Sequence, residues 1–382
     1  MRILLLSAYA ARSHVAWREA LQTMLPEHEF TVLELPPRHF NWRVRGNPLH
    51  WALAETKALT ADYDLLLATS MVDLATLRGL VPALASLPSL LYFHENQFAY
   101  PASAHQTGQV EVQMVSIYSA LAADRLAFNS CFNRDSFLDG VSTLLRRLPD
   151  KVPPGIVDRL RARSQDLPVP FSSPVMGDAE KDRGASAFRG SRGNAPETLR
   201  ILWVGRLEYD KGCDRLPAFA ELLEQSGVDF ELAVVGQEFR ERPASVSELQ
   251  NRFGHRLVHV GYLPSREDYL ATLLDADVVV STALHEFQGL AVLEAVSLCC
   301  LPIVPNRQVY SEWFDAEFLY EGDTADATVD GRAAAEAVMR IAALQRAGRV
   351  SAPDVSRFSQ QALAGDYRDL FADTSALASP AT

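Results

Sequence analysis

At 382 residues the chain exceeds the usual size of a single domain, so the sequence predicts two domains. Hydrophobic residues make up 48% of the chain and charged residues 22%, values typical of a soluble globular protein. No run of about 18 apolar residues occurs, so we expect no transmembrane helix.

The net charge of −12 is unevenly distributed along the chain. Residues 1–170 carry 16 Lys and Arg against 16 Asp and Glu, whereas residues 195–382 carry 16 against 29. Because nucleic acids are polyanions, a nucleic-acid partner would have to approach the N-terminal half.

The N-terminus and the cysteines favour a cytoplasmic protein. The apolar run after Arg2 has only about five residues, below the roughly 7–15 of a signal peptide, so we predict a first β-strand there. The four cysteines, Cys131, Cys213, Cys299 and Cys300, lack zinc-type spacing. We interpret them as small buried hydrophobic residues in a reducing compartment.

Short apolar runs recur, and each precedes a polar turn and a segment with helical spacing. In the first half they lie at 2–8, 31–35, 64–70, 89–95 and 125–130, and after residue 195 at 199–205, 230–236, 256–262, 277–283 and 301–305. Strands that alternate with helices predict βαβ units and parallel sheets. Two such sets predict an α/β protein of two doubly wound, Rossmann-like domains that face a central cleft.

Composition suggests where these domains end. We predict domains at 1–170 and 198–355, a flexible linker at 171–197, a last helix at 356–371 and a disordered tail at 372–382. The linker is rich in Gly, Ser, Pro and mixed charge and has no apolar period. Because ligands bind beyond the carboxyl ends of parallel strands, the residues just after each strand are the candidate site residues.

The segment "WVGRLEYDKG" at 203–212 places two cations after the first strand of the second domain. Gly205 ends the strand, and Arg206 and Lys211 follow on one loop. A planar bidentate cation and a point charge together suit a diphosphate. The alternative is a solvated loop with scattered charges.

The segment "HEFQGLAVLE" at 285–294 follows another predicted strand. Gly289 is placed to begin a helix, whose first amides, those of Gly289 and Leu290, would donate to phosphate. Glu294, little more than one turn into the helix, could accept from a sugar diol, and Glu286 precedes the turn. The alternatives are a solvated helix glutamate and a loop acid that favours a helix start.

Hydrogen-bonding residues also follow two strands of the first domain. His94, Asn96 and Gln97 come from "YFHENQ", and Ser13 and His14 follow the first strand without a Gly-x-Gly-x-x-Gly pattern. The last two lie where phosphate could approach. For the first group the alternative is a hydrogen-bonded network that closes the turn, and for His14 it is a capping or structural role.

The segment at 36–51 interleaves basic and aromatic residues, among them Arg38, Trp42 and Arg43. Such a mixture suits neutralisation of an RNA backbone and stacking on bases. The alternative is a surface loop whose aromatics pack on their own domain. Asp-x-Asp occurs at 62–64 and 275–277, but at the amino ends of strands, so we predict no metal site.

The Glu-x7-Glu spacing of Glu286 and Glu294, with Gly-Arg…Asp-Lys-Gly upstream, resembles the retaining glycosyltransferases of the GT-B fold (glycosyltransferase family 4-like). The resemblance implies a nucleotide sugar bound in the C-terminal domain, an acceptor bound in the N-terminal domain, and no metal or other cofactor. It also implies that Arg206 and Lys211 hold the diphosphate, Glu294 the ribose, and Glu286 the donor sugar.

A closer resemblance covers most of both domains. The segments at 35–46, 92–101, 128–138 and 281–296 look like those of tRNA-queuosine mannosyltransferases. This family implies transfer of mannose, with retention, from GDP-mannose to the cyclopentene diol of queuosine in aspartate tRNA. Two departures stand out: Phe287-Gln288-Gly289 replaces the family's Phe-Phe-Gly, and Ala11–His14 replaces a Gly-Gly-Ser-His-like start.

Together these features define the predicted site. The catalytic set implied by resemblance is Glu286, His94, Arg206 and Lys211; the donor set is Gly205, Arg206, Lys211, Gln288, Gly289, Leu290 and Glu294; the acceptor set is Ser13, His14, Asn96, Gln97, Arg38, Trp42 and Arg43. One alternative function is a GT-B enzyme that uses another nucleotide sugar or a glycan or lipid acceptor. A second is a non-catalytic module that binds tRNA or a nucleotide sugar.

Overall fold

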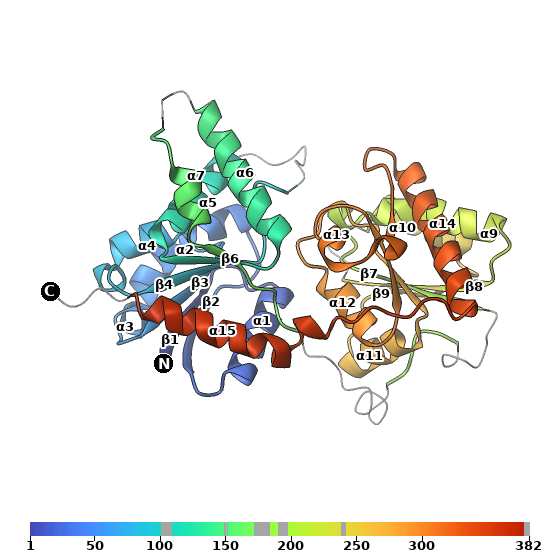
Figure 1. Cartoon of the computed structure of the whole chain (residues 1–382), viewed down its shortest axis with the longest axis horizontal. Coiled ribbons are helices and arrows are strands. Elements are labelled where there is room, and N and C mark those ends of the chain that lie inside the picture. Colours follow the sequence, from blue (N-terminus) through green and yellow to red (C-terminus); the bar gives the residue numbers. More distant parts are fainter. Residues whose placement is uncertain are drawn as a thin grey trace. The chain divides into compact units, whose positions relative to one another are not determined.

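A computed structural model describes residues 1–100, 109–148, 150, 152–171, 184–189, 198–237 and 242–377 (Figure 1). The chain divides into two compact units: unit 1 is Met1–Ser172 with Phe358–Thr382, and unit 2 is Ser173–Arg357. Most of the predicted linker lies outside the described residues. No helix in the described ranges is both long and apolar enough to cross a bilayer.

Unit 1 contains a six-stranded parallel sheet of order β2-β1-β3-β4-β5-β6. The strands are β1 Arg2–Ser7, β2 Glu29–Glu34, β3 Leu65–Thr69, β4 Ser89–Phe93, β5 Arg125–Phe128 and β6 Ser164–Asp166. From β1 the chain adds β2 on one side of the sheet, and then adds β3 to β6 on the other side, so the strand order reverses between β1 and β3. This pair is therefore the topological switch point of unit 1.

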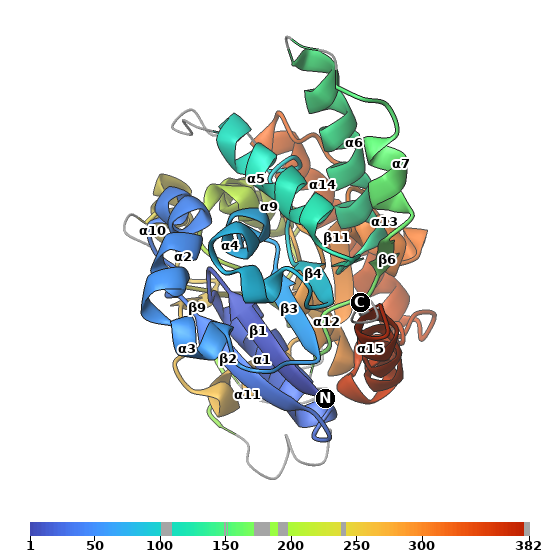
Figure 2. The ribbon, with the colours of Figure 1, turned by 90° about the vertical axis from the view of Figure 1, so that its left-hand side faces the viewer.

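Helices cover both faces of this sheet (Figure 2). They are α1 Arg12–Met24, α2 Phe40–Ala54, α3 Thr56–Leu59, α4 Leu74–Leu80, α5 Gln109–Ala122, α6 Cys131–Arg147, α7 Ile156–Arg161 and α15 Gln360–Ser375. α15 packs against α1, β3 and β4, whereas α2, α4 and α5 pack together. The last helix of the chain thus completes the layer that α1 begins.

Unit 2 contains a second six-stranded parallel sheet, of order β12-β11-β10-β7-β8-β9. Its strands are β7 Leu199–Val204, β8 Phe230–Val235, β9 Leu257–Gly261, β10 Val278–Val280, β11 Leu301–Pro305 and β12 Leu319–Tyr320. Its helices are α9 Leu216–Gln225, α10 Ala244–Phe253, α11 Arg266–Asp275, α12 Leu290–Ser297, α13 Tyr310–Trp313 and α14 Ala327–Arg346. In this Rossmann order the switch point lies between β7 and β10.

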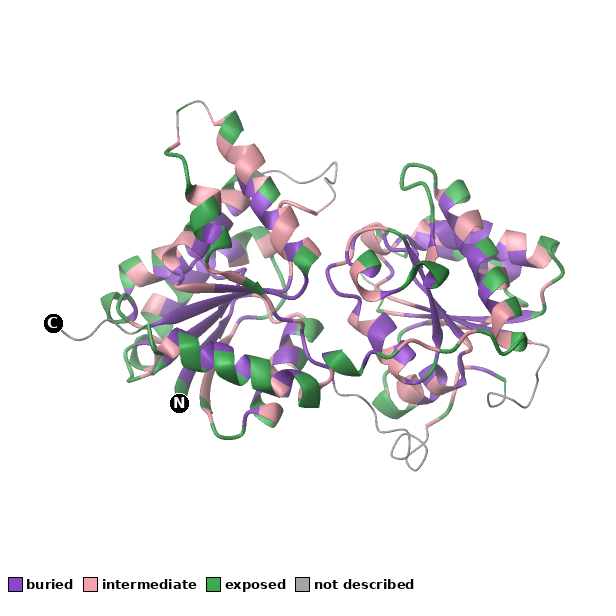
Figure 3. Ribbon diagram, in the orientation of Figure 1, coloured by how far each residue is buried: buried purple, intermediate pink, exposed green. Residues whose placement is uncertain are grey.

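The central strands are almost wholly apolar because helices bury both of their faces (Figure 3). All ten predicted strands are present. The short edge strands β6 and β12 were not predicted, since three polar residues and a dipeptide carry no strand pattern. β10 ends at Val280 rather than at residue 283, because Ser281 and Thr282 begin a loop bound by their own side chains.

Two expectations are wrong in detail. The last helix is Gln360–Ser375 rather than 356–371, so four residues of the predicted disordered tail are helical. Its buried residues, which include Tyr367 and Phe371, recur on one face, and that face packs on unit 1. Of the cysteines, Cys213 and Cys300 are buried as expected, but Cys131 and Cys299 are exposed.

Tyr367 anchors α15 through its hydroxyl, which accepts the indole N–H of buried Trp17 at 2.9 Å and lies 3.0 Å from the carbonyl of Pro168. Tyr367→Phe leaves that buried N–H without its acceptor. We expect a loss of about 1–3 kcal/mol in the free energy of unfolding of unit 1, measured by urea denaturation. The control is Arg368→Gln, which removes an exposed ion pair with Glu27 and should change stability by less than about 1 kcal/mol. Equal losses in the two variants would contradict this account of the anchor.

Candidate active site

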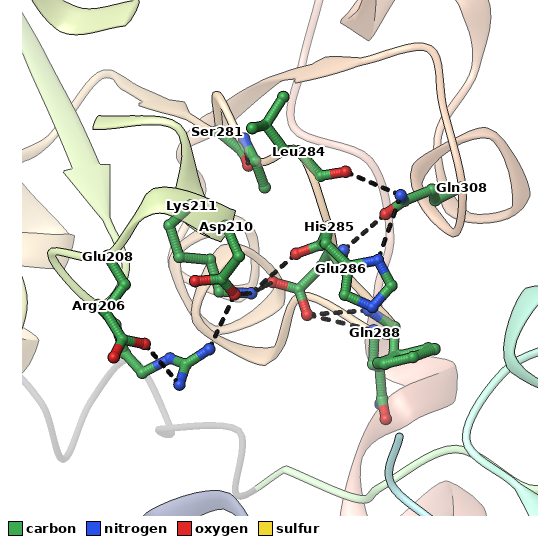
Figure 4. Close-up of polar contacts among 12 residues, drawn as sticks. Arg206, Glu208, Asp210, Lys211, Ser281, Leu284, His285, Glu286, Gln288 and Gln308 are labelled. Atoms are coloured by element: carbon green, nitrogen blue, oxygen red, sulfur yellow. Dashed lines mark hydrogen bonds and ion pairs between the residues drawn. The ribbon is translucent and has the colours of Figure 1, made fainter. Parts of the chain in front are cut away.

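The loops after β7 and β10 lie side by side at the switch point of unit 2, because these two strands pair directly. The first loop carries Arg206 and Lys211, and the second carries Glu286. These are the loops that the sequence singled out, and the Rossmann order explains why they meet. Figure 4 shows their polar side chains turned toward one another.

Two glycines allow the backbones to approach closely. Gly212 has φ +67°, and a Cβ there would lie 2.0 Å from the carbonyl oxygen of Thr282. The Thr282 hydroxyl accepts from the indole of Trp203 at 2.9 Å and donates to the carbonyl of Gly212 at 2.9 Å. A Cβ on Gly236 would lie 1.7 Å from the carbonyl oxygen of Gly205, so Gly205 is packed against the end of β8.

Lys211 and Glu286 tie the two loops together. The Lys211 ammonium donates to the Glu286 carboxylate at 2.9 Å and to the carbonyl of His285 at 3.0 Å. The other oxygen of Glu286 accepts the backbone N–H of Phe287 at 3.1 Å. Burial alone would raise the pKa of Glu286, but the charge and hydrogen bond of Lys211 outweigh it and lower that pKa to about 2. Glu286 is therefore ionised at neutral pH.

Arg206 is already paired, which the sequence did not suggest. Its guanidinium contacts Glu208 at 2.7 Å and Asp210 at 2.8 Å. Both acids lie between the two cations in the same loop, and that position was the available signal. Burial raises the pKa of Glu208 despite Arg206. The loop cations are thus neutralised by acids of the protein itself, and a diphosphate would have to replace them.

Gly289 precedes α12, as predicted. Its backbone conformation and its packing give a further reason for a glycine at this position. It has φ +74°, and a Cβ there would lie 2.9 Å from the ring of Tyr310. The N–H of Val292 donates to the carbonyl of Gly289, and this is the first hydrogen bond of the helix. The amides of Gly289 and Leu290 therefore have no partner within the helix, which suits an anion.

Glu294 lies on α12 and is held from α11. Its carboxylate accepts from Arg266 at 2.6 Å and from the Tyr269 hydroxyl at 3.0 Å. Burial, followed by the charge of Glu294, raises the pKa of Tyr269 well above its ordinary value, so the phenol remains a donor. These bonds orient a carboxylate whose side chain remains 18% exposed, and each oxygen has a second lone pair for a ligand.

Gln308, just after β11, was not predicted. Its amide oxygen accepts the N–H of Glu286 at 2.6 Å, and its amide nitrogen donates to the carbonyl of Leu284 at 2.8 Å. Its φ is +55°, a left-handed value that costs energy for a side-chain-bearing residue. No sequence pattern marks such a residue. Gln288, by contrast, is buried, and its carbonyl accepts from the indole of Trp313 at 3.1 Å.

In unit 1, His94 and His14 form a stacked pair after β4 and β1, with ring centroids 4.1 Å apart. Trp17 contacts the His94 ring edge-on at 4.8 Å. Burial, and then the charge of His14, lower the pKa of His94 well below its ordinary value, so the imidazole is neutral. Its Nε2 is buried and lacks a hydrogen-bond partner among the described residues. Ser13 is exposed on the first turn of α1.

Asn96 does not fit the predicted acceptor set. Its amide nitrogen donates to the backbone and side chain of Asn133, and its amide oxygen accepts the N–H groups of Phe98 and Ala99. It is 2% exposed, so the structure favours the alternative of a network that closes the turn. Gln97 is also buried, which leaves its side chain little surface for a large acceptor.

The basic and aromatic segment is mostly a helix rather than a loop. α2 begins at Phe40, Arg38 precedes it on the surface, and Arg43 is half-buried. Trp51 packs into the core, so the alternative of packing on its own domain holds for that indole, whereas Trp42 is 59% exposed. Among the described residues, no three His, Cys, Asp or Glu side chains gather as a metal site would require.

A family model described as tRNA-queuosine alpha-mannosyltransferase N-terminal matches residues 2–171, and one described as Glycosyl transferases group 1 matches residues 186–349. A tRNA-queuosine alpha-mannosyltransferase of Drosophila melanogaster is 33% identical over 374 residues, which cover 97% of this chain and 96% of that protein. The chain belongs to this family. It is a glycosyltransferase, as its sequence motifs predicted.

Two further proteins are similar to this chain, one in sequence over a short segment and one in fold. A GDP-mannose-dependent alpha-(1-6)-phosphatidylinositol dimannoside mannosyltransferase of Mycobacterium tuberculosis is 31% identical over 113 residues, 29% of this chain and 28% of that protein. The crystal structure of a UDP-forming trehalose-phosphate synthase from Burkholderia xenovorans matches 100% of this chain and 99% of its own, with a TM-score of 0.68 and 13% identity. This similarity confirms the GT-B fold.

Gln308→Ala tests the support of the Glu286 loop. Because the two loop bonds are lost, we expect turnover to fall about 10- to 100-fold. Gln308→Gly loses the same bonds but relieves the left-handed strain, so it should be more stable than the alanine variant by about 1 kcal/mol and equally slow. The measurements are steady-state kinetics and thermal unfolding. Wild-type turnover in both variants would remove Gln308 from the site.

Glu286→Gln tests the ion pair with Lys211 through pH. The folded pKa is about 2 against an ordinary 4.5, so the carboxylate stabilises the protein above pH 4.5, and this stability disappears as pH falls toward 2. We expect the variant to be less stable at pH 7 by up to about 3 kcal/mol. The difference should shrink as pH falls below 4.5. A pH-independent difference in denaturant unfolding would contradict the pairing.

Proposed function

We propose that this enzyme transfers a mannosyl group from GDP-mannose to the cyclopentene diol of queuosine in tRNA, with retention at the anomeric carbon. The observation that carries the proposal is the joined pair of loops at the switch point of unit 2, with cations, helix amides and a Glu-x7-Glu pair within it. The Drosophila relative, similar along its whole length, supports the acceptor, and the mycobacterial relative supports the donor.

The donor binds to unit 2 in this proposal. The diphosphate lies on the amides of Gly289 and Leu290 and draws Arg206 away from Glu208 and Asp210. Arg206 exchanges carboxylate oxygens for phosphate oxygens, which suit its bidentate geometry equally well. The ribose hydroxyls donate to Glu294, which Arg266 and Tyr269 hold in place.

Transfer breaks the bond between the anomeric carbon and the diphosphate and forms one from that carbon to a queuosine hydroxyl. The leaving diphosphate gains negative charge, which Arg206, Lys211 and the α12 amides stabilise. The hydroxyl proton passes to the leaving phosphate. Glu286, an ionised carboxylate held by Lys211, contacts the sugar but does not supply a proton.

Unit 1 binds the acceptor in this proposal. His94 contacts the transferred sugar as a neutral imidazole, because its buried site disfavours the charged form. Exposed Ser13, Arg38 and Trp42 are the acceptor contacts that the structure leaves accessible. With a tRNA substrate, we expect the enzyme to act in the cytoplasm.

The test incubates the enzyme with GDP-mannose and tRNA from strains with and without queuosine, followed by mass spectrometry of nucleosides. We expect one hexose on queuosine and none on tRNA that lacks it. Lys211→Ala should lose turnover about 100-fold or more while binding tRNA normally. Transfer with another nucleotide sugar alone, or to a glycan alone, would reassign the donor or acceptor. No transfer or donor hydrolysis with any nucleotide sugar would favour a binding module.

A further inference from the structure

Trp42 presents one open face of its indole on the surface of unit 1. It lies in the first turn of α2 and is 59% exposed, whereas Trp17, Trp51 and Trp203 are each 1% exposed. Single exposed hydrophobic residues are common and need no explanation. The residue four positions later on the helix makes this one unusual.

Gly46 seats the inner face of the indole. A Cβ at Gly46 would lie 2.6 Å from Cε2 of Trp42, 2.9 Å from Cζ2 and 3.0 Å from Cδ2. Cε2 is bonded to three ring atoms and carries no hydrogen, so a point this close lies over the ring face and not beside its edge. Glycine destabilises a helix interior relative to alanine, and here it lets the indole lie flat on the backbone.

The segment that carries the indole is basic. Residues 35–54 contain three arginines and two histidines but no acid, in a chain of net charge −12. Arg45 is engaged by Asp73 at 2.6 Å and Glu111 at 3.1 Å. Arg38 is exposed and Arg43 half-buried on the same segment. An exposed aromatic side chain on a segment that also carries arginines is typical of surfaces that bind single-stranded RNA.

Polar contacts hold the part of α2 next to Gly46 at the carboxyl edge of the sheet. The amide of Asn47 donates to the carbonyl of Met71 at 3.2 Å and accepts the N–H of Asp73 at 3.3 Å, both in the loop after β3. The ring of Phe40 lies 5.9 Å from that of Tyr9, which follows β1. β1 and β3 form the switch point of unit 1, where doubly wound domains bind ligands.

We propose that Trp42, seated on Gly46, is a stacking platform for one unpaired base of the tRNA, with Arg38 contacting the adjacent phosphate. This inference rests on the proposed function. Stacking does not discriminate among bases, because every base has a π face. The platform therefore holds the RNA and does not itself select queuosine.

The test measures binding of queuosine-containing tRNA at several salt concentrations. Trp42→Ala should weaken binding about 5- to 100-fold with an unchanged salt slope, and Trp42→Phe should recover most of the loss. Arg38→Gln should instead reduce the slope of log K against log salt by about one. Leu53→Ala, which truncates a 77% exposed side chain of the same helix, should bind like wild type.

Gly46→Ala separates the platform from the fold. The added methyl displaces the indole, so tRNA binding should weaken, although alanine should keep or raise the thermal stability of the helix. Wild-type affinity in both Trp42→Ala and Gly46→Ala overturns the inference. A change in self-association of Trp42→Ala without a change in tRNA affinity assigns the surface to a protein partner and also overturns it. If the wild-type enzyme neither binds nor modifies tRNA, the proposed function itself fails.

Discussion

The ion pair between Lys211 and Glu286 is the constraint on which the rest of the site depends. It spans two loops that are 75 residues apart in the chain and adjacent only because β7 pairs with β10. Gly212 and Thr282 bring the two backbones into contact beneath it. Gln308 then holds the backbone just before Glu286, through the carbonyl of Leu284 and the N–H of Glu286 itself. The two loops are therefore linked, and we expect a mutation in either to affect both.

Charge balance gives this site its chemistry. Three acids, Glu208, Asp210 and Glu286, surround two cations, Arg206 and Lys211, so without a ligand the cluster has a charge near −1 when all three are ionised. A nucleotide diphosphate adds further negative charge. Binding therefore requires that Arg206 give up its acids and that the α12 amides contribute, and burial, which raises the pKa of Glu208, weakens the hold of that acid on Arg206. The competing acids also keep Arg206 in place when no donor is bound.

The sequence predicted what local patterns encode. Near-continuous apolar runs predicted ten of the twelve strands of the two sheets, and the position of Gly289 after one of them located the start of α12. Edge strands β6 and β12 were not predicted, because three polar residues and a dipeptide form no apolar run. The helix of 360–375 was foreseen, with shifted ends, but its place in unit 1 was not, since a long-range packing partner leaves no mark on local sequence.

The candidate site residues show the same difference between what local sequence patterns indicate and what they do not. The charged residues and glycines predicted after the strands lie on adjacent loops of unit 2, and their positions follow from the Rossmann order. Gln308 was missed because a left-handed glutamine has no signature. Asn96 was assigned to the acceptor because hydrogen-bonding capacity in a sequence does not reveal that Asn133 and two backbone amides already use it.

The central claim is that the two joined loops bind the donor diphosphate through Arg206. Calorimetric titration of GDP-mannose without tRNA tests it most directly, with Arg206→Gln compared with wild type and with Arg252→Gln, an exposed arginine of unit 2 that pairs with Glu221 and Glu248. The account predicts that Arg206→Gln weakens binding about 10- to 100-fold and that Arg252→Gln does not change it. Equal affinity of Arg206→Gln and wild type would contradict the account.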